Sequence, residues 1–260
     1  MKPQIIESRY GYLVAYEDDR YLGEAIINYG EYGNEEADFL LSLLPKDAHI
    51  VEVGANAGYL TIPLASRYNV IAIEPQPSCY GLLLANMALN NLYERILCVN
   101  AACGSESGFC YVPTIDYQYP GNHGGIEVQT EAKGMFQTMV QVKTLDELIG
   151  SPIGLIKADV EGMEIDVLKG AKETIKKYQP FLYVENDRLE KSQELIEYIW
   201  SIGYDCMYHT PALFNPKNHL GKIENLWPNV GSVNMICAPK DRKLLEKPVL
   251  KATDRPCDNL

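Results

Sequence analysis

The stretch that decides the fold runs from His49 to Pro75 and reads HIVEVGANAGYLTIPLASRYNVIAIEP. A short apolar run leads into a turn that begins and ends with glycine. A segment of helical character follows, and a second apolar run closes on Glu74. This order of strand, turn, helix and strand is typical of an open parallel sheet. Such sheets bind ligands beyond the carboxyl ends of their strands, so we expect the turn from Gly54 to Tyr59 and the Glu74 carboxylate to meet at one site.

The glycine turn also indicates what kind of ligand the site takes. The dinucleotide fingerprint Gly-x-Gly-x-x-Gly has a middle glycine that lets the backbone approach a pyrophosphate. Here the turn has only Gly54 and Gly58, and Glu52 lies two residues before the first of them. A carboxylate at this place repels a pyrophosphate but suits a cationic ligand such as S-adenosylmethionine, which has an ammonium, a sulfonium and no phosphate. Glu74 is placed to accept hydrogen bonds from ribose hydroxyls.

Two other interpretations of the turn stay open at this point. Gly54 and Gly58 could merely permit a tight turn and close helix packing, although that leaves Glu52 unexplained. An NAD-dependent oxidoreductase would use the same fold, although it favours a third glycine and tolerates Glu52 poorly.

Composition sets the limits for the rest of the chain. The 260 residues are 47% apolar, enough for a sizeable core in one domain. With 23 basic against 35 acidic residues the formal net charge is −12, which argues against nucleic acid as a partner. Seven cysteines without a Cys-x-x-Cys pair predict reduced thiols instead of a zinc site or disulfides. We expect a cytoplasmic protein with no membrane partner, because the first residues do not resemble a signal peptide and no apolar run reaches ~18 residues.

Apolar runs and amphipathic segments alternate along the chain. They predict an α/β fold: a doubly wound, Rossmann-like sheet of about seven strands. The last two strands have no helix between them, which predicts an antiparallel hairpin at the edge of a mostly parallel sheet. We expect further strands at residues 96–103, 109–112 (returning as a hairpin), 139–142, 153–160, 180–184, 204–208 and 232–238, and helices at 34–44, 58–67, 78–91, 164–178 and 189–202.

Three regions follow from this pattern. Residues 1–45 should form N-terminal strands and a helix that pack on the core, residues 46–240 the main domain, and residues 241–260 a polar tail. A loop at 113–138 with little periodicity interrupts the main domain. Loops of this length inside a domain often bind ligands, so we expect it to contact the acceptor.

Four segments resemble the FkbM-type methyltransferases, a branch of the class I, S-adenosylmethionine-dependent fold. They are VEVGANAGYLTIPLA from Val51, IEPQP from Ile73, LIKADVEGMEIDVLKGA from Leu155 and PFLYVEND from Pro180. Tyr29-Gly30-Glu31-Tyr32 and Asn122-His123-Gly124-Gly125 extend the resemblance.

The resemblance implies transfer of a methyl group from S-adenosylmethionine to a hydroxyl of a sugar, glycan or secondary metabolite, with S-adenosylhomocysteine as product. The glycine turn and Tyr59 would wrap the methionine part, Glu74 would hold the ribose, and Asn100 and Ala101 would lie by the adenine. The cofactor-binding residues expected on this basis are Glu31, Glu52, Gly54, Asn56, Gly58, Tyr59, Glu74, Pro75, Asn100, Ala101 and Asp159.

Charged residues alternate at the end of the strand predicted at 153–160. Lys157, Asp159 and Glu161 are hard to explain as core residues of a buried strand and should face an occupied pocket. Asp159 is our first candidate for orienting the acceptor hydroxyl or taking its proton, and an N-cap role is its alternative. Lys157 either pairs with one of these acids or meets the substrate. His123 is an alternative base in the glycine-rich loop, and His209 is another.

Two further features bear on the acceptor. Asp159, Glu185 and Asn186 end neighbouring strands and offer the oxygen ligands of a magnesium site, as in catechol-type methyltransferases, but the FkbM pattern does not require a metal and we do not expect one. Aromatic residues could form an acceptor pocket, cover the sheet edge or make a homodimer interface. A catalytically inactive nucleoside-binding module also stays open. The aromatic residues are Tyr117, Tyr119, Phe136, Tyr208, Phe214 and Trp227.

Overall fold

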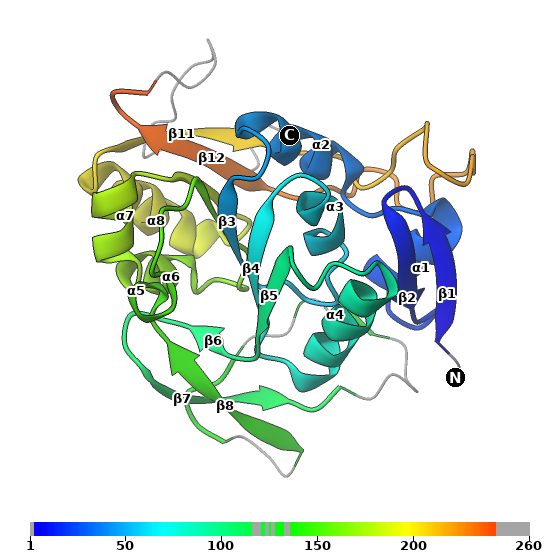
Figure 1. The fold of residues 1–260 in the computed structure, drawn as a ribbon, viewed down its shortest axis with the longest axis horizontal. Coiled ribbons are helices and arrows are strands. Elements are labelled where there is room, and N and C mark those ends of the chain that lie inside the picture. Colours follow the sequence, from blue (N-terminus) through cyan, green and yellow to red (C-terminus); the bar gives the residue numbers. More distant parts are fainter. Residues whose placement is uncertain (1–2, 116–120, 123–124, 126–127, 133–135, 243–260) are drawn as a thin grey trace.

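The fold is built on one seven-stranded sheet with helices on both faces (Figure 1). The computed structural model describes residues 3–115, 121–122, 125, 128–132 and 136–242. Along the sheet the strand order is β11-β12-β10-β9-β3-β4-β5. The strands are β3 (His49–Val53), β4 (Asn69–Ile73), β5 (Ile96–Val99), β9 (Leu155–Ala158), β10 (Phe181–Glu185), β11 (Tyr204–His209) and β12 (Asn234–Pro239).

The sheet separates two apolar cores because successive strand residues point to opposite faces. In β3, Val51 and Val53 join one core, whereas Ile50 joins the other. Helices α6 (Glu164–Lys169), α7 (Lys172–Tyr178) and α8 (Leu189–Ser201) cover the first face; α2 (Asn34–Leu43), α3 (Thr61–Ala65) and α4 (Pro77–Leu89) cover the second. The predicted doubly wound α/β fold is confirmed.

The predicted antiparallel hairpin at the sheet edge is also confirmed, with a refinement. β12 pairs antiparallel with both β10 and β11, so it lies inside the sheet and β11 forms the edge. The crossover from β10 through α8 to β11 leaves room for one strand, and β12 enters it from the opposite direction.

Three predicted elements differ from the structure. The strand expected at 96–103 is two strands: β5 stops at Val99, and β6 (Ala102–Cys103) joins a separate sheet of order β6-β8-β7 with β7 (Gly108–Pro113) and β8 (Gln137–Lys143). The hairpin partner of β7 is therefore β8. The helix expected at 164–178 breaks at Gly170, where a Cβ would lie 2.0 Å from the Gly104 carbonyl oxygen. The helix expected at 58–67 shortens to α3, since Gly58 has a φ of +82°.

The N-terminal part packs onto the second face. β1 (Gln4–Ser8) and β2 (Gly11–Ala15) form a hairpin, and α1 (Leu22–Tyr29), which the sequence did not predict, lies beside it (Figure 1, blue). Asn86 of α4 accepts a hydrogen bond from the Val14 N–H at 2.7 Å, so the hairpin is held to α4. A short α5 (Leu145–Leu148) begins after Thr144, whose side chain accepts a hydrogen bond from the Glu147 N–H and caps it. In the part of the chain that is described, no helix has the length and apolarity to cross a bilayer.

Candidate active site

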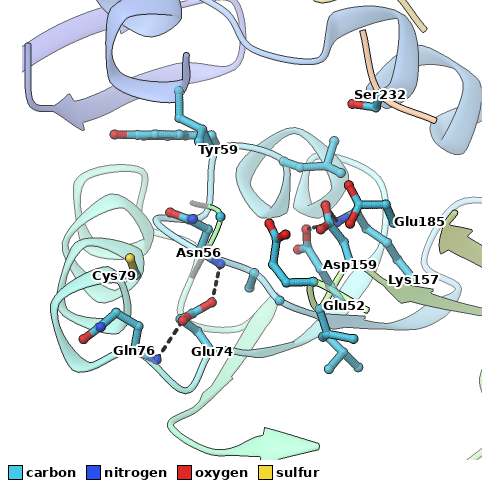
Figure 2. Close-up of a pocket in the computed structure, with 18 of the residues that line it drawn as sticks. Glu52, Asn56, Tyr59, Glu74, Gln76, Cys79, Lys157, Asp159, Glu185 and Ser232 are labelled. Carbon is cyan, nitrogen blue, oxygen red and sulfur yellow. Dashed lines mark hydrogen bonds and ion pairs between the residues drawn. The ribbon is translucent and has the colours of Figure 1, made fainter. Parts of the chain in front are cut away.

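A cavity of about 570 Å³ opens at the carboxyl ends of β3, β4, β9 and β10. Its walls come from the turn after β3, the residues after the other three strands, α2, and the segment that leads into β12. Figure 2 shows Glu74 at one side of the cavity and the group Lys157, Asp159 and Glu185 at the other, with Glu52 between them. The strand ends and the glycine turn thus meet at one site, as the sequence predicts.

The glycine turn is shaped by close approach of the backbone. Gly54 has a φ of +80°, and a Cβ there would lie 1.8 Å from the Asp159 carbonyl oxygen. A Cβ on Gly58 would lie 2.7 Å from Leu83 Cδ1, so Gly58 serves the packing of α4 and does not line the cavity. Gly54 therefore brings the turn after β3 against the chain leaving β9, and Asn56 and Tyr59 face the cavity.

Glu74 is held at the cavity wall by the backbone. Its carboxylate accepts hydrogen bonds from the Asn56 N–H at 2.8 Å and the Gln76 N–H at 2.7 Å. Burial raises the pKa of Glu74 to about 7, and the two N–H groups oppose that rise. The carboxylate keeps free lone pairs that can accept further hydrogen bonds from a diol. Pro75 follows it on the same wall.

A buried lysine connects the two acids that the sequence predicts at the strand ends. Lys157 Nζ lies 3.3 Å from Asp159 Oδ2 and 3.9 Å from Glu52 Oε1. Thr61 donates a further hydrogen bond to Glu52 at 2.6 Å. Burial by itself would lower the pKa of Lys157, but the surrounding carboxylates outweigh burial and raise it, so Lys157 is cationic. The Asp159 side chain is 40% exposed and open to the cavity.

Further acids line the same region. Burial raises the pKa of Glu36, at the start of α2, to about 7, and nearby Lys157 opposes this rise. The pKa of Glu161 also rises to about 7 through burial and the Asp159 charge, although Glu161 is ion-paired with Arg188. Burial and the charge of Asp159 raise the pKa of Glu185 to about 10.

Several predicted site residues lie elsewhere. Glu31 is buried but accepts hydrogen bonds from Asn215 Nδ2 at 2.7 Å and the His219 N–H at 3.2 Å, outside the cavity. Asn100 donates to the carbonyl oxygens of Glu74 and Pro75 and so braces the chain after β4. Neither Asn100 nor Ala101 lines the cavity; Ala102 and Cys103 do, because the chain has left the sheet after Val99.

The surroundings of the candidate bases show which of them face the cavity. Asp159 is not an N-cap, since α6 begins at Glu164 and the Glu164 carboxylate itself accepts from the Val160 and Gly162 N–H groups. His209 Nδ1 is 2.8 Å from the Tyr183 hydroxyl and its ring packs on Phe39, away from the cavity. His123 lies outside the described residues.

One of the three residues that the sequence offers as possible metal ligands, Asn186, lies outside the cavity. Asn186 donates to the Tyr208 hydroxyl at 3.1 Å and does not line the cavity. Glu161 takes its place, and oxygen atoms of Asp159, Glu161 and Glu185 lie within 4.8 Å of one another.

Of the six aromatic residues singled out in the sequence, those that the structure describes do not line the cavity. Tyr21, Tyr32 and Tyr59 line the cavity. Phe214 and Trp227 instead pack on Tyr29, with ring centroids 5.3 and 5.8 Å away. Phe136 is 77% exposed and Tyr208 bonds Asn186, whereas Tyr117 and Tyr119 lie outside the described residues.

Sequence reasoning missed two groups of lining residues. Tyr32 and Glu36 come from the chain before β3, and Leu213, Val230, Gly231 and Ser232 come from the segment between β11 and β12. Glu36 resembles an ordinary acid in the first turn of a helix, and no motif singles out the later segment. Only contacts between distant parts of the chain bring these residues to the cavity.

Comparisons with known proteins agree with this geometry. Residues 52–206 match the family model of the methyltransferase FkbM domain. Methyltransferase sdnD of Sordaria araneosa is 29% identical over 162 residues, 50% of this chain and 62% of that protein. Methyltransferase 1 of Beauveria bassiana (strain ARSEF 2860) is 31% identical over 149 residues, 48% of this chain and 59% of that protein. The matches thus span about three fifths of the length of these relatives.

Two solved structures share the fold. The methyltransferase FkbM from Methylobacillus flagellatus KT superposes with a TM-score of 0.51 at 18% identity, over 75% of this chain and 44% of that one. The precorrin-6y C5,15-methyltransferase from Geobacter metallireducens GS-15 superposes with a TM-score of 0.51 at 13% identity, over 78% of this chain and 87% of that one. They confirm the class I methyltransferase fold. Because the family match covers more than half of the sequence, the chain belongs to the methyltransferase FkbM domain family.

Proposed function

We propose that the protein is an S-adenosylmethionine-dependent O-methyltransferase that acts on a hydroxyl of a sugar, glycan or secondary-metabolite acceptor. One observation carries the proposal: a single cavity holds Glu74 at one side and the Lys157–Asp159 pair at the other, both at the carboxyl ends of parallel strands. Membership of the FkbM domain family supports a methyltransferase over the NAD-dependent alternative.

The residues present fit the cofactor. Glu74, fixed by two backbone N–H groups, accepts hydrogen bonds from the ribose hydroxyls. Glu52, although paired with Lys157, lines the cavity and suits a ligand with a cationic end. The turn lines the cavity as well, at Gly54, Ala55, Asn56 and Tyr59. When bound, S-adenosylmethionine supplies an electrophilic methyl group on a sulfonium.

Asp159 is the acceptor-side group in this proposal. Its partly exposed carboxylate would accept a hydrogen bond from the acceptor hydroxyl and take its proton. The hydroxyl oxygen would gain the methyl group as the methyl–sulfur bond breaks, with S-adenosylhomocysteine as the leaving group. Lys157 orients Asp159 through their ion pair. Holding the hydroxyl in line with the methyl group supplies much of the rate enhancement, because orientation removes an entropic cost.

Calorimetric titration with S-adenosylhomocysteine tests the cofactor half. We expect sub-millimolar binding by the unmodified protein and about tenfold weaker binding, or about 1.4 kcal/mol, for Glu74→Gln, which loses acceptor capacity towards the ribose. Glu106→Gln, on an exposed turn, removes the same charge and should bind like the unmodified protein. Absence of binding, or equal binding by Glu74→Gln, would contradict the proposal.

Turnover separates an enzyme from an inactive nucleoside-binding module. With methyl-labelled cofactor and a panel of hydroxyl acceptors, we expect label transfer that falls about 10²- to 10⁴-fold in Asp159→Asn while S-adenosylhomocysteine still binds. Binding without transfer to any acceptor would favour the inactive module.

A further inference from the structure

The side of the cavity opposite Glu74 collects carboxyl groups from three parts of the chain. Glu36 comes from α2, Asp159 and Glu161 follow β9, and Glu185 ends β10. We call these four residues the acidic end. They lie where the proposed function puts the acceptor, beside Asp159.

Protein cations balance only part of this charge. Among the described residues, seven acids line the cavity (Glu36, Glu52, Glu74, Asp159, Glu161, Glu185 and Asp187) against two cations, Lys157 and Arg188. Lys157 pairs with Glu52 and Asp159, and Arg188 pairs with Glu161 and Asp187. Within the described part of the chain Glu36, Glu74 and Glu185 are left without a cation, and two of them, Glu36 and Glu185, belong to the acidic end.

The side chains of Glu36 and Glu185 are also short of hydrogen bonds. Glu36 is only 6% exposed, and within the described part of the chain its carboxyl has neither a hydrogen-bond nor an ion-pair partner. Glu185 Oε2 is buried and likewise without a partner there. Burying an unpaired carboxylate is costly, so both groups hold a proton more tightly than usual. A ligand that supplies positive charge and N–H donors would remove this cost.

We propose that the acceptor carries a protonated amine close to the hydroxyl that is methylated, and that the acidic end binds this ammonium group. The inference deepens the proposed function and rests on it. An ammonium group has three N–H donors and matches carboxyl groups that lack partners. It also needs no fixed coordination geometry.

An organic cation suits the acidic end better than a divalent metal. Of the three acids close enough to share an ion, Asp159 and Glu161 are already paired with Lys157 and Arg188. A metal there would be repelled by two nearby protein cations and would find only Glu185 unpaired. A single positive charge meets less of this repulsion.

Matched pairs of small probes test the proposal on the intact chain. Glucosamine is compared with glucose, and 2-aminoethanol with ethane-1,2-diol, by calorimetry at pH 7 with and without saturating S-adenosylhomocysteine. We expect the amine to bind at least about tenfold more tightly than the alcohol in each pair. In the double variant Glu36→Gln/Glu185→Gln the preference should fall below about threefold, whereas Glu106→Gln should keep it. Circular dichroism shows whether the double variant is folded, and the single variants serve if it is not.

The outcomes separate the two proposals. Lack of S-adenosylhomocysteine binding counts against the proposed function. Equal affinities within each pair, including absence of binding by the amines, overturn the ammonium site even where the cofactor product binds. Binding of Mg²⁺ or Mn²⁺ that competes with the amines and is lost in the double variant would also overturn it, in favour of a metal site.

Discussion

Gly54 shows how one residue sets the geometry of the site. Its φ of +80° and the 1.8 Å that would separate a Cβ on Gly54 from the Asp159 carbonyl oxygen exclude any side chain. We expect Gly54→Ala to lower the free energy of unfolding by about 3 kcal/mol, because backbone strain and a clash add. Gly81→Ala, in α4 with open space around it, should raise that free energy by roughly 0.5–1 kcal/mol. Urea denaturation measures both, and equal effects would contradict the close approach.

The sequence predicts single residues well where their role depends on neighbours along the chain. Glu52, Glu74 and Asp159 follow or end apolar runs, so parallel pairing alone carries them to one edge. Glu31 belongs to a motif too, but its carboxylate accepts from groups 184 and 188 residues away and fastens a loop. A side chain's partner across that separation cannot be read from local pattern.

At the scale of elements, the segment between β11 and β12 depends on the N-terminal part. The Tyr29 hydroxyl donates to the Glu224 carbonyl oxygen and accepts from the Leu226 N–H, and Glu31 accepts from Asn215 and the His219 N–H. These contacts hold one wall of the cavity in place.

Loss of the Glu31 charge should loosen that wall without touching the cofactor half. We expect Glu31→Gln to speed amide hydrogen exchange in residues 213–226 by about tenfold, since a buried charged hydrogen bond is worth roughly 1.5 kcal/mol. S-adenosylhomocysteine affinity should stay within about twofold. Glu7→Gln, an exposed acid on β1, controls for charge. A large loss of affinity with unchanged exchange would instead place Glu31 at the cofactor, as the family resemblance implies.

The same contrast explains which elements the sequence predicts. β3, the glycine turn and β4 follow from local period and turn chemistry, and they appear at the predicted residues. The break after Val99, the break at Gly170 and the position of β12 inside the sheet depend on distant partners: β8, the Gly104 carbonyl and β10, respectively. These features depend on packing between segments that are far apart in the sequence. The spacing of apolar residues along the chain cannot predict such contacts.

At the scale of the whole molecule, the formal net charge of −12 is partly gathered in the cavity. Burying several unpaired acids lowers the stability of the folded protein, and a bound cation would reduce that cost. The stability of the protein alone should therefore depend on pH in a direction opposite to that of a protein whose acids are all ion-paired.

The sign follows from the shifted acids. Burial raises the pKa values of Glu36, Glu74 and Glu161 from 4.5 to about 7 and that of Glu185 to about 10, so above pH 4.5 the folded protein binds more protons than the unfolded chain. The free energy of unfolding must then fall as pH rises through this window. The raised pKa of Lys157 adds stability that does not change with pH below pH 10.5. The hydrogen bond from Arg95 lowers the pKa of Asp47, so the titration of Asp47 changes the stability only at pH values below this window.

We therefore expect the ligand-free protein to lose at least about 2 kcal/mol of unfolding free energy between pH 5 and pH 8. One acid shifted from 4.5 to about 7 can contribute up to about 3 kcal/mol, and coupling among the acids reduces the sum. Urea titrations at several pH values measure the loss. Glu36→Gln should flatten the curve because an uncharged amide replaces the titrating carboxyl, and Glu106→Gln should leave it unchanged. A curve that is flat or rises to pH 8 would mean that the cavity acids are ionised at neutral pH in the empty protein, which would contradict the raised pKa values of Glu36 and Glu185.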